Sequence, residues 1–193
     1  MANHQQLLLA SSSVYRKSLL EKFGLAFDTC SPDIDESALP AEDAQTLVRR
    51  LAVLKALAVT PQYPEHLIIA SDQVAVLGDK ILGKPGDFDN AVAQLSACSG
   101  QVVTFYTSLC VHDARSDVST TLVEPFEVGF RDLNEVEIHN YIKMEQPLDC
   151  AGSFKSEGLG VSLFKRMEGD DPTSLIGLPL IELCNILRAA HYM

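Results

Sequence analysis

Residues 7–20 read LLLASSSVYRKSLL, an apolar run followed at once by hydroxyl and basic side chains. The apolar part is typical of a short buried strand, which we expect over Gln6–Ser11. Ser12 or Ser13 then supplies an N-cap for an amphipathic helix. A strand that passes directly into a helix is a recurring unit of α/β folds, so this stretch favours that fold class.

The remainder of the chain continues the alternation of strands and helices. Apolar runs and helical spacings predict strands at 25–30, 67–70 and 161–164, and helices at 43–60, 87–98, from 134 onward and from 179 to 187. In the helix at 43–60, the apolar stripe that we expect to face the core comprises Leu47, Val48, Leu51, Leu54 and Ala58. Residues 103–111 and 126–130 alternate apolar with more polar side chains, which predicts two long antiparallel strands. The pattern predicts a mixed, twisted α/β sheet with helices on both faces and a long antiparallel hairpin.

The composition is that of a globular protein with a core. The chain has 193 residues, of which 47% are hydrophobic and 21% are charged, and this length suits one domain spanning residues 1–193. It has 26 acidic and 15 basic residues, so the formal net charge is −11. That excess argues against a nucleic-acid partner, because gripping a phosphate backbone needs clustered Lys and Arg. A small anionic ligand remains compatible, since a few cations and a helix N-terminus can hold one phosphate group.

The sequence shows no pattern typical of a membrane span, a secretory signal or a disulfide framework, which bears on the expected location of the protein and the redox state of its cysteines. The apolar runs are about four residues long, far short of the ~20 residues that span a bilayer, so we expect no membrane partner. The start, MANHQQLLLASSS, lacks the basic region and the apolar length of a secretory signal. The five cysteines are widely spaced and form no CxxC pair, which argues against a disulfide framework or a zinc ribbon. We therefore expect a cytoplasmic protein with reduced thiols.

The segment Ser11–Lys17 is a candidate phosphate-binding site. Hydroxyl groups, backbone N–H groups and two cations meet where a strand is expected to pass into a helix, and a helix N-terminus attracts anions. The plainer interpretation is a serine N-cap beside a solvated Arg-Lys pair.

Asp72 is a candidate for holding a metal or orienting water. It follows the apolar run at 67–70, and we expect it at the carboxyl end of that strand, the usual place for a ligand in an α/β sheet. The alternative is a turn-initiating aspartate. Lys84 lies between Gly83 and Pro85 in what should be a stiff turn, although a lone lysine in a turn usually faces solvent.

The loop at 150–160 is a third candidate, because two glycines bracket polar and basic residues in AGSFKSEG at 151–158. Small residues permit close approach of the backbone to a ligand, and a flexible surface loop is the alternative. Cys150 precedes the motif, but with no His nearby in the sequence its support as a nucleophile is weak. The five histidines form no HxH or HExxH pair, which argues against a histidine-based zinc site.

Five motifs, in order and spacing, resemble those of the Maf family of nucleotide pyrophosphatases. They are LLLASSSVYRKSLL, DIDES at 33–37, the lysine of LAVLKALA, SDQVAVLGDKILGKPG at 71–86 and AGSFKSEGLG at 151–160. The ending DPTSLIGLPLIEL also resembles the closing helix of that family, so the likeness covers nearly the whole chain. SDQV and FKSEG resemble the branch that acts on 7-methyl-GTP, whereas the branch acting on dTTP and UTP typically has Thr in place of Gln73 and Gln in place of Glu157.

The resemblance implies a Maf/ITPase-like fold with two lobes around a central cleft. It also implies a hydrolase dependent on a divalent metal, Mg²⁺ or Mn²⁺, that cuts a nucleoside triphosphate between its α and β phosphates. The products would be the monophosphate and pyrophosphate, and the role would be removal of modified nucleotides from the pool. Carried over residue by residue, the catalytic set is Asp72, Glu36, Lys55 and Lys84, the metal ligands are Asp72 and Glu36, and the substrate-binding residues are Ser11 and Arg16.

The residues that the resemblance assigns to specificity are Tyr15, Gln73 and Glu157. Methylation at N7 gives guanine a positive charge, so the Tyr15 ring can stack on the base through a cation–π interaction. The Glu157 carboxylate can accept hydrogen bonds from the Watson–Crick edge, and Gln73 can contact a remaining polar edge. The chain departs from the family pattern at Val14, where proline is usual, and at Lys17, which replaces an arginine and cannot grip phosphate bidentately.

Two alternative functions remain open at this point. One is a nucleotide-binding regulatory module linked to cell division or septum formation, which would bind a nucleotide without turnover. The other is an unrelated α/β hydrolase that uses Cys150. For an α/β enzyme of this size we also expect a homodimer with a two-fold interface.

Overall fold

The computed structural model describes residues 5–192 and is built around one seven-stranded mixed sheet. The strands are β1 (Gln6–Ala10), β2 (Phe27–Cys30), β3 (His66–Leu77), β4 (Lys80–Leu82), β5 (Val102–Asp113), β6 (Val118–Phe130) and β7 (Phe164–Glu168). Their order is β2-β1-β3-β5-β6-β7, with β4 paired to β3 outside that path. β1 runs parallel to β2 and β3, whereas the remaining pairs are antiparallel. The predicted mixed sheet and its long β5–β6 hairpin are confirmed.

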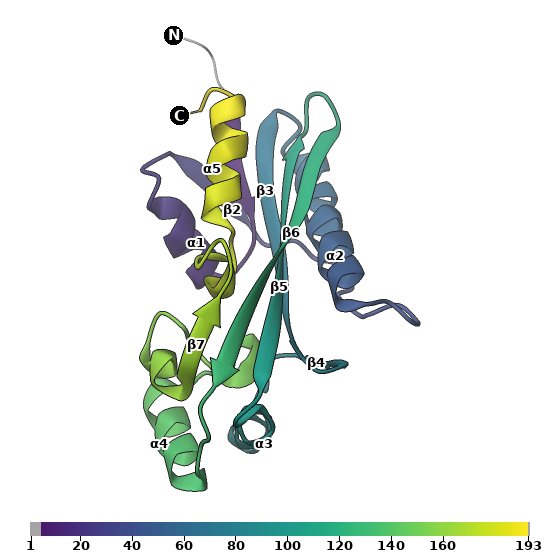
Figure 1. Ribbon diagram of the computed structural model, residues 1–193. Helices are drawn as coiled ribbons and strands as arrows, with labels where there is room; N and C mark the ends of the chain where they lie inside the picture. Colours follow the sequence, from purple (N-terminus) through teal and green to yellow (C-terminus); the bar gives the residue numbers. More distant parts are fainter. Residues whose placement is uncertain (1–4, 193) are drawn as a thin grey trace.

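Five α-helices surround the sheet, α1 (Val14–Glu21), α2 (Ala44–Val59), α3 (Phe88–Cys98), α4 (Glu135–Glu145) and α5 (Leu180–Ala189). Short 3₁₀ turns lie at η1 (Thr60–Gln62), η2 (Ala151–Ser153), η3 (Leu159–Leu163) and η4 (Ser174–Ile176). α1 and α5 cover one face of the sheet and α2 covers the other, as Figure 1 shows. Four helices begin at a residue whose side chain accepts a hydrogen bond from the first turn, namely Ser13, Asp43, Asp87 and Asn134.

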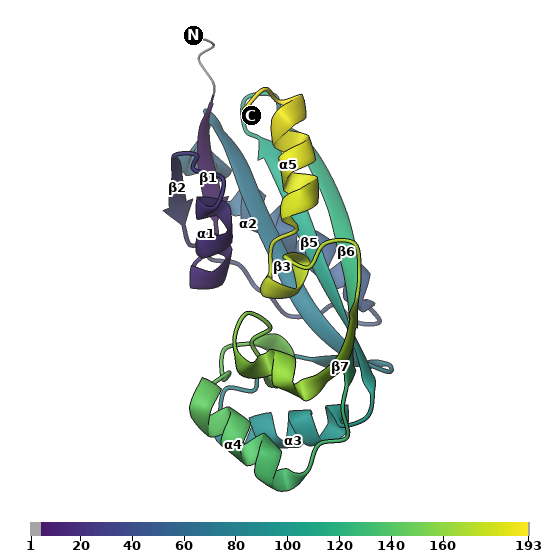
Figure 2. The same ribbon diagram turned by 60° about the vertical axis from the view of Figure 1, so that its left-hand side comes forward.

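The sheet joins two lobes. β3, β5 and β6 run through the length of the molecule, with α1, α2 and α5 packed at one end and α3 and α4 at the other (Figure 2). In the first lobe, Leu7 and Leu9 pack in one cluster with α5, while Leu8 and Ala10 pack in another with α2. This alternation is the two-residue period of a strand buried on both faces, and it places α1 and α2 on opposite sides of the carboxyl end of β1.

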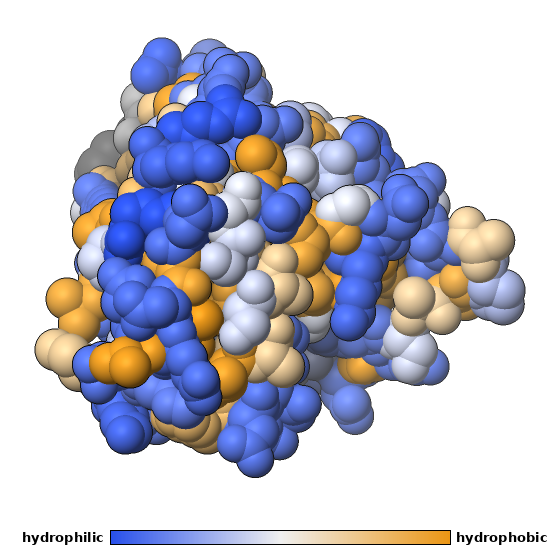
Figure 3. Space-filling model, turned by 60° about the horizontal axis from the view of Figure 1, so that its bottom comes forward, coloured by the Kyte–Doolittle hydropathy of each residue, from blue (hydrophilic) through white to orange (hydrophobic). Residues whose placement is uncertain are grey.

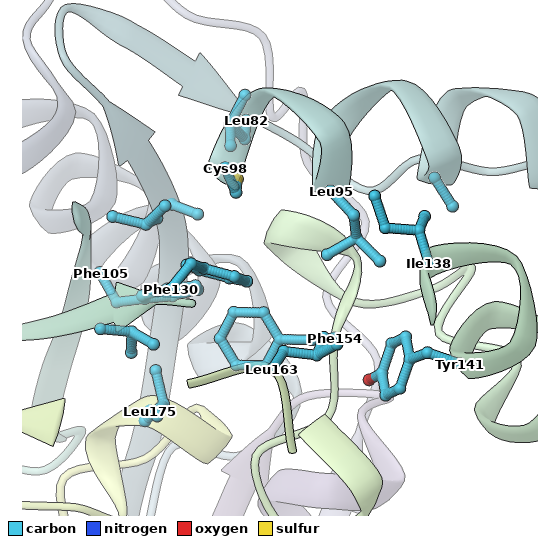
Figure 4. Packing of buried hydrophobic residues seen from close by; sticks show 14 of the residues in the cluster. Leu82, Leu95, Cys98, Phe105, Phe130, Ile138, Tyr141, Phe154, Leu163 and Leu175 are labelled. Carbon is cyan, nitrogen blue, oxygen red and sulfur yellow. The ribbon is translucent and has the colours of Figure 1, made fainter. Parts of the chain in front are cut away.

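The second lobe has its own core, built largely from aromatic rings. Phe154 lies edge-on to Phe105, Phe130 and Phe164, with ring centroids 5.2, 5.7 and 4.8 Å away. Figure 4 shows Phe105, Phe130 and Phe154 beside Leu163 and Tyr141 in this cluster. Because η2 leads directly into Phe154, this ring anchors the 150–160 loop to the sheet.

One strand prediction is wrong in a way that changes the location of Asp72. β3 does not end before this residue but continues to Leu77, because β5 pairs with it through the whole stretch and Asp72 lies opposite Ser108. The pairing of β1 with β3, by contrast, ends at Leu9 and Ile69. Asp72 therefore lies in the interior of a long strand, three residues beyond the point where its parallel neighbour departs.

Two further expectations need correction. On α2, Leu54 and Ala58 are exposed, and the buried positions are Leu47, Val48, Leu51, Ala52, Lys55, Ala56 and Val59. The buried face follows the i, i+4 rows, so the predicted stripe combined two different faces of the helix. The last strand begins at Phe164 rather than at 161, because residues 159–163 form the turn η3.

Exposed apolar side chains are spread over several elements, for example Val14 on α1, and Val136 and Met144 on α4. On the face drawn in Figure 3, hydrophobic residues are interspersed with hydrophilic ones. None of the helices within residues 5–192 combines the length and the hydropathy needed to cross a membrane.

Candidate active site

A cleft of about 560 Å³ is lined by residues of both lobes. Its volume falls in the range of small-molecule sites. All nine residues to which the family resemblance assigns a role line it, namely Ser11, Tyr15, Arg16, Glu36, Lys55, Asp72, Gln73, Lys84 and Glu157. They come from six separate segments of the chain, so the fold gathers side chains up to 146 positions apart (157 − 11). Lys17, at the end of the Ser11–Lys17 candidate, is not among the lining residues and lies beside Glu21.

The β1–α1 junction presents hydroxyl groups and the start of a helix to the cleft. The Ser13 hydroxyl accepts a hydrogen bond from the Arg16 backbone N–H at 3.4 Å, which makes Ser13 the N-cap of α1. The Ser13 N–H in turn donates to the Ser11 hydroxyl at 3.1 Å. Both serines therefore shape the turn itself, so the N-cap interpretation is correct and a phosphate-binding role would be additional to it.

Lys55 joins the two candidate acidic residues. Its Nζ lies 2.6 Å from Asp72 Oδ1 and 2.9 Å from Glu36 Oε1. Lys55 and Asp72 are only 6% and 7% exposed, so this ion pair is buried and the interaction between its charges is weakly screened. α2 carries Lys55 on its core-facing side and β3 carries Asp72, which fixes the two charged groups on two rigid elements.

Glu36 and Lys84 complete the charged end of the cleft. Partial burial alone would raise the pKa of Glu36, but the hydrogen bond and charge of Lys55, together with the charges of Lys84 and Arg16, outweigh it and leave the pKa below its ordinary value. The cations of three separate segments thus act on one carboxylate. We call this group of five residues, Arg16, Glu36, Lys55, Asp72 and Lys84, the phosphate end of the cleft.

The backbone of Asp72 is held by a buried serine. The Asp72 N–H donates to the Ser108 hydroxyl at 3.0 Å, and that hydroxyl donates to the carbonyl oxygen of Val48 at 2.7 Å. Ser108 on β5 thus connects β3 to α2, the two elements that carry Asp72 and Lys55.

Arg16 is oriented by a carbonyl group near the opposite end of the sequence. Its Nε donates to the carbonyl oxygen of Gly177 at 2.8 Å, and the Ser71 hydroxyl donates to the same oxygen at 2.8 Å. Burial lowers the pKa of the Arg16 guanidinium, while the charges of Asp72 and Glu36 oppose that shift. Because Nε is held by the Gly177 carbonyl oxygen, this contact also sets the direction in which the two terminal nitrogens of the guanidinium point.

Gln73 contacts the chain just before Gly177. Its Nε2 lies 2.9 Å from Thr107 Oγ1, 2.8 Å from the Ser174 carbonyl oxygen and 3.2 Å from the Leu175 carbonyl oxygen. The donor half of this amide is therefore bonded to η4 and β5. Because these contacts use the Nε2 half of the amide, a ligand in the cleft would meet the carbonyl oxygen of Gln73.

The other end of the cleft, which we call the base end, comprises Tyr15, Asp149 and Glu157. The Tyr15 hydroxyl lies 3.4 Å from both carboxylate oxygens of Asp149. Burial, followed by the charges of Cys150, Asp149 and Glu157, raises the pKa of Tyr15, so its hydroxyl is a donor at neutral pH. Both carboxylates are exposed.

Cys150 lies beside this end, with Sγ 3.8 Å from the Tyr15 hydroxyl oxygen. Burial, reinforced by the charge of Asp149, raises the pKa of the thiol to about 12. A thiol with that pKa is protonated at neutral pH, and the thiolate is the nucleophilic form. The raised pKa of this thiol therefore argues against the hydrolase that would use Cys150.

The glycine-containing loop is packed rather than flexible. Gly152 has φ +73°, and a Cβ there would lie 3.1 Å from the Phe105 ring. At Gly160 a Cβ would lie 2.3 Å from the Lys155 carbonyl oxygen. These glycines permit the chain to fold tightly on itself, which positions Asp149, Cys150 and Glu157 at the cleft.

The donor groups at the phosphate end suit a small divalent cation. Within residues 5–192, His, Cys, Asp and Glu form no group of three or more that would hold a metal, so a cation at Asp72 and Glu36 would need further ligands from the substrate or water. Mg²⁺ is commonly held by one or two carboxylates together with substrate phosphates. Asp72 and Glu36 both contact Lys55, so a metal held by them together with a nucleotide would share their oxygens with this ammonium group.

Comparison with known sequences assigns this arrangement to a family. A family profile described as Maf-like protein matches residues 6–190. The chain belongs to the Maf family. Similar curated proteins bear the name 7-methyl-GTP pyrophosphatase. They include those of Colwellia psychrerythraea, 55% identical over 94% of this chain and 91% of the relative, and of Nitrosococcus oceani, 54% identical over 96% and 94%. That of Pseudoalteromonas translucida is 56% identical over 94% of this chain and 90% of the relative.

The cleft of this Maf protein also contains residues that sequence reasoning missed. Asp149 and Gly177 both line it and contact Tyr15 and Arg16 respectively. Asp149 lies two positions before Ala151, where the AGSFKSEGLG motif begins, so a longer motif window would have included it. Gly177 acts through its backbone oxygen, and no side-chain pattern signals such a role.

Proposed function

We propose that this protein hydrolyses 7-methyl-GTP to 7-methyl-GMP and pyrophosphate in the cleft. The observation that carries the proposal is the buried Lys55, which holds Asp72 and Glu36 at 2.6 and 2.9 Å in the same cleft as Arg16 and Lys84. Relatives 54 to 56% identical over nearly the whole chain bear the name 7-methyl-GTP pyrophosphatase, which supports the same reaction.

Binding of the triphosphate would rest on positive charge and hydrogen-bond donors. Arg16, Lys55 and Lys84 would neutralise the phosphate oxygens, and the β1–α1 turn at Ser11 would donate hydrogen bonds to them. Phosphoryl transfer depends mainly on positioning and charge neutralisation, with little covalent chemistry left to the protein. The guanidinium of Arg16, aimed by Gly177, would contact two phosphate oxygens at once.

Hydrolysis would proceed by attack of water on the α-phosphorus. The bond from that phosphorus to the bridging oxygen breaks, and pyrophosphate leaves with the bridging oxygen and its electron pair. Asp72 would orient the attacking water and accept its proton, while Lys55 keeps the carboxylate in place. When bound at Asp72 and Glu36, Mg²⁺ or Mn²⁺ would supply Lewis-acid neutralisation of the developing charge.

Recognition of the base would take place at the base end. The face of Tyr15 would stack on the cationic 7-methylguanine, and Glu157 would accept hydrogen bonds from its N–H groups. Gln73, whose Nε2 is already bonded to the protein, would offer its carbonyl oxygen.

Pyrophosphate release by the purified protein tests the proposal directly. With Mg²⁺ or Mn²⁺ present, 7-methyl-GTP should be hydrolysed faster than GTP, UTP and dTTP, and a chelator should abolish the reaction. In Glu157→Gln the preference over GTP should weaken, because the substituted side chain can no longer offer two carboxylate oxygens to the base. Absence of turnover on all four nucleotides with metal present would overturn the assignment.

The cellular role follows from the same proposal. The protein would act as a homodimer in the cytoplasm on free nucleotides, with no nucleic-acid partner, and would remove modified nucleotides from the pool. No observation on the chain favours the regulatory module linked to septum formation. Sedimentation analysis tests the dimer, and fractionation of cells expressing a tagged chain tests the location.

A further inference from the structure

We propose that Asp149 is a further specificity-determining residue, whose carboxylate beside Tyr15 selects nucleotides with a positively charged base. The inference rests on the proposed function, because it concerns which nucleotides the same cleft accepts. It assigns to the site a class of substrates, the purine nucleoside triphosphates alkylated at N7, rather than a single methylated compound.

The position of Asp149 relative to Tyr15 is the first observation. The Tyr15 hydroxyl reaches both oxygens of Asp149 at 3.4 Å, and both residues line the cleft. A phenol that donates toward a carboxylate has a more electron-rich ring, and an electron-rich ring attracts a cation more strongly. Asp149 thus acts on a stacked base through its own charge and through the ring of Tyr15.

The distribution of charge along the cleft is the second observation. At the phosphate end, Asp72 and Glu36 are both paired with Lys55. In the part of the chain that the structure describes, no Lys, Arg or His nitrogen lies within 4 Å of the carboxylates of Asp149 or Glu157. The nearby ammonium group of Lys155 instead donates to the carbonyl oxygen of Glu145 at 2.8 Å.

The base end has two carboxylates that form no ion pair within the described residues, whereas the phosphate end has three cations against two carboxylates and so a net positive charge. This distribution of charge matches a molecule with opposite charges at its two ends. A triphosphate is such a molecule only when its base is a cation. N7-alkylated guanine meets that condition, whereas neutral guanine brings no charge to compensate Asp149 and Glu157. Burial and the neighbouring Cys150 contribute most to the raised pKa of Tyr15, and the charges of Asp149 and Glu157 add to that rise.

The role of charge can be separated from that of shape by choice of substrate. We would measure kcat and KM for 7-methyl-GTP, for GTP and for 7-methyl-7-deaza-GTP, which has the methyl group but a neutral base. The wild-type protein should prefer 7-methyl-GTP over both neutral compounds. 7-ethyl-GTP, which is cationic but larger, should remain a substrate.

Asp149→Asn removes the charge and keeps an oxygen that can accept from Tyr15. The variant should lose roughly tenfold in kcat/KM for 7-methyl-GTP through a higher KM, since the base lies away from the bond that breaks. Its constants for the two neutral nucleotides should stay within about twofold of wild type. Asp117→Asn is the matched control, because Asp117 is 89% exposed on the β5–β6 hairpin and has φ +56°, a conformation that Asn tolerates.

An equal loss on all three substrates would show that Asp149 only supports the loop, and an unchanged preference in Asp149→Asn would overturn the proposal. Equal use of 7-methyl-GTP and its deaza analogue by wild type would overturn charge selection while leaving the proposed reaction intact. If the wild-type protein hydrolyses none of these nucleotides, the proposed reaction is wrong. The role of Asp149 is then decided by calorimetry, which measures binding of the same nucleotides without metal. Weaker binding of 7-methyl-GTP alone in the variant supports it, and equal binding contradicts it.

Discussion

The two ends of the cleft are built in different ways. At the phosphate end, Lys55 and Asp72 are buried, meet at 2.6 Å and are carried by a helix and a central strand. At the base end, Asp149 and Glu157 are exposed on a loop, and the contact from Asp149 to Tyr15 is 3.4 Å long. Buried charges interact strongly and exposed charges are screened by water. We therefore expect rate to depend on the first end, and choice among nucleotides on the second.

The largest effect is expected from Asp72→Asn. This change preserves the size of the side chain but removes the charge that would accept a proton from water, so pyrophosphate release should fall by about 10³-fold. Turnover of 7-methyl-GTP under saturating metal measures it, with Asp117→Asn as the exposed control. Retention of wild-type turnover would remove Asp72 from the mechanism.

Lys55→Met tests how far the phosphate end depends on its buried pair. Removing the ammonium group leaves Asp72 buried without a partner, which should cost about 3 to 5 kcal/mol of stability. Arg115→Met, which breaks an exposed pair with Glu65, should cost less than about 1 kcal/mol. Urea unfolding of both variants measures the difference, and similar costs would contradict the contrast between buried and exposed charges.

Glu36→Gln should reduce turnover at least about 10-fold, because the variant lacks one of the two carboxylates that would hold the metal. The stability of wild type and Glu36→Gln, measured over a range of pH, tests the pKa shift of Glu36. Because the pKa of Glu36 is lowered from 4.5 on folding, the stability from its pairing with Lys55 is present above that value and disappears as pH falls through the lowered pKa. The melting temperatures of wild type and variant should differ at pH 7 and converge in acid, and a constant difference would disprove the assigned shift.

A smaller effect is expected from Tyr15→Phe. The ring remains available for stacking, while the hydroxyl contact with Asp149 is lost, so KM for 7-methyl-GTP should rise about threefold with little change in kcat. Steady-state kinetics measure both constants. A fall in kcat as large as that of Glu36→Gln would mean that the two ends are not separate in function.

The smallest effect is expected from Cys150→Ser, within about twofold of wild-type turnover. With a pKa raised to about 12, the thiol should react slowly with iodoacetamide at pH 8. The rate of alkylation, followed by mass spectrometry, should rise only in strongly alkaline solution. Rapid alkylation at pH 8 with loss of turnover would instead support Cys150 as the nucleophile.

Local patterns were sufficient to predict most of the elements. Alternation over 103–111 and 126–130 predicted the β5–β6 hairpin, and the helix predicted from residue 134 onward is α4, which Asn134 caps. Local patterns failed where pairing with a distant strand of the same chain determines how far a strand extends. β3 passes through Asp72 because β5 pairs with it there, and a pairing partner 36 residues away is invisible in a local window.

In the candidate site, too, local sequence patterns identified some features and missed those that depend on the tertiary fold. Residue types and motif resemblance identified nine side chains that do line the cleft. They did not identify the contacts that orient those side chains, such as the Ser108 hydroxyl behind Asp72 or the Gly177 carbonyl oxygen beside Arg16. Serine and glycine are common residue types, and their position relative to Asp72 and Arg16 is determined only by the tertiary fold.

The hydrogen bond from Arg16 to Gly177 also has a consequence for protein synthesis. It spans 161 positions of the chain, so a ribosome makes the arginine early and the oxygen that aims it much later. Until residue 177 has been added and has emerged from the exit tunnel, Arg16 has no such acceptor. A chain that stops between residues 72 and 177 would therefore contain Glu36 and Asp72 but no carbonyl oxygen to orient Arg16, and we expect such a chain not to hydrolyse nucleotides.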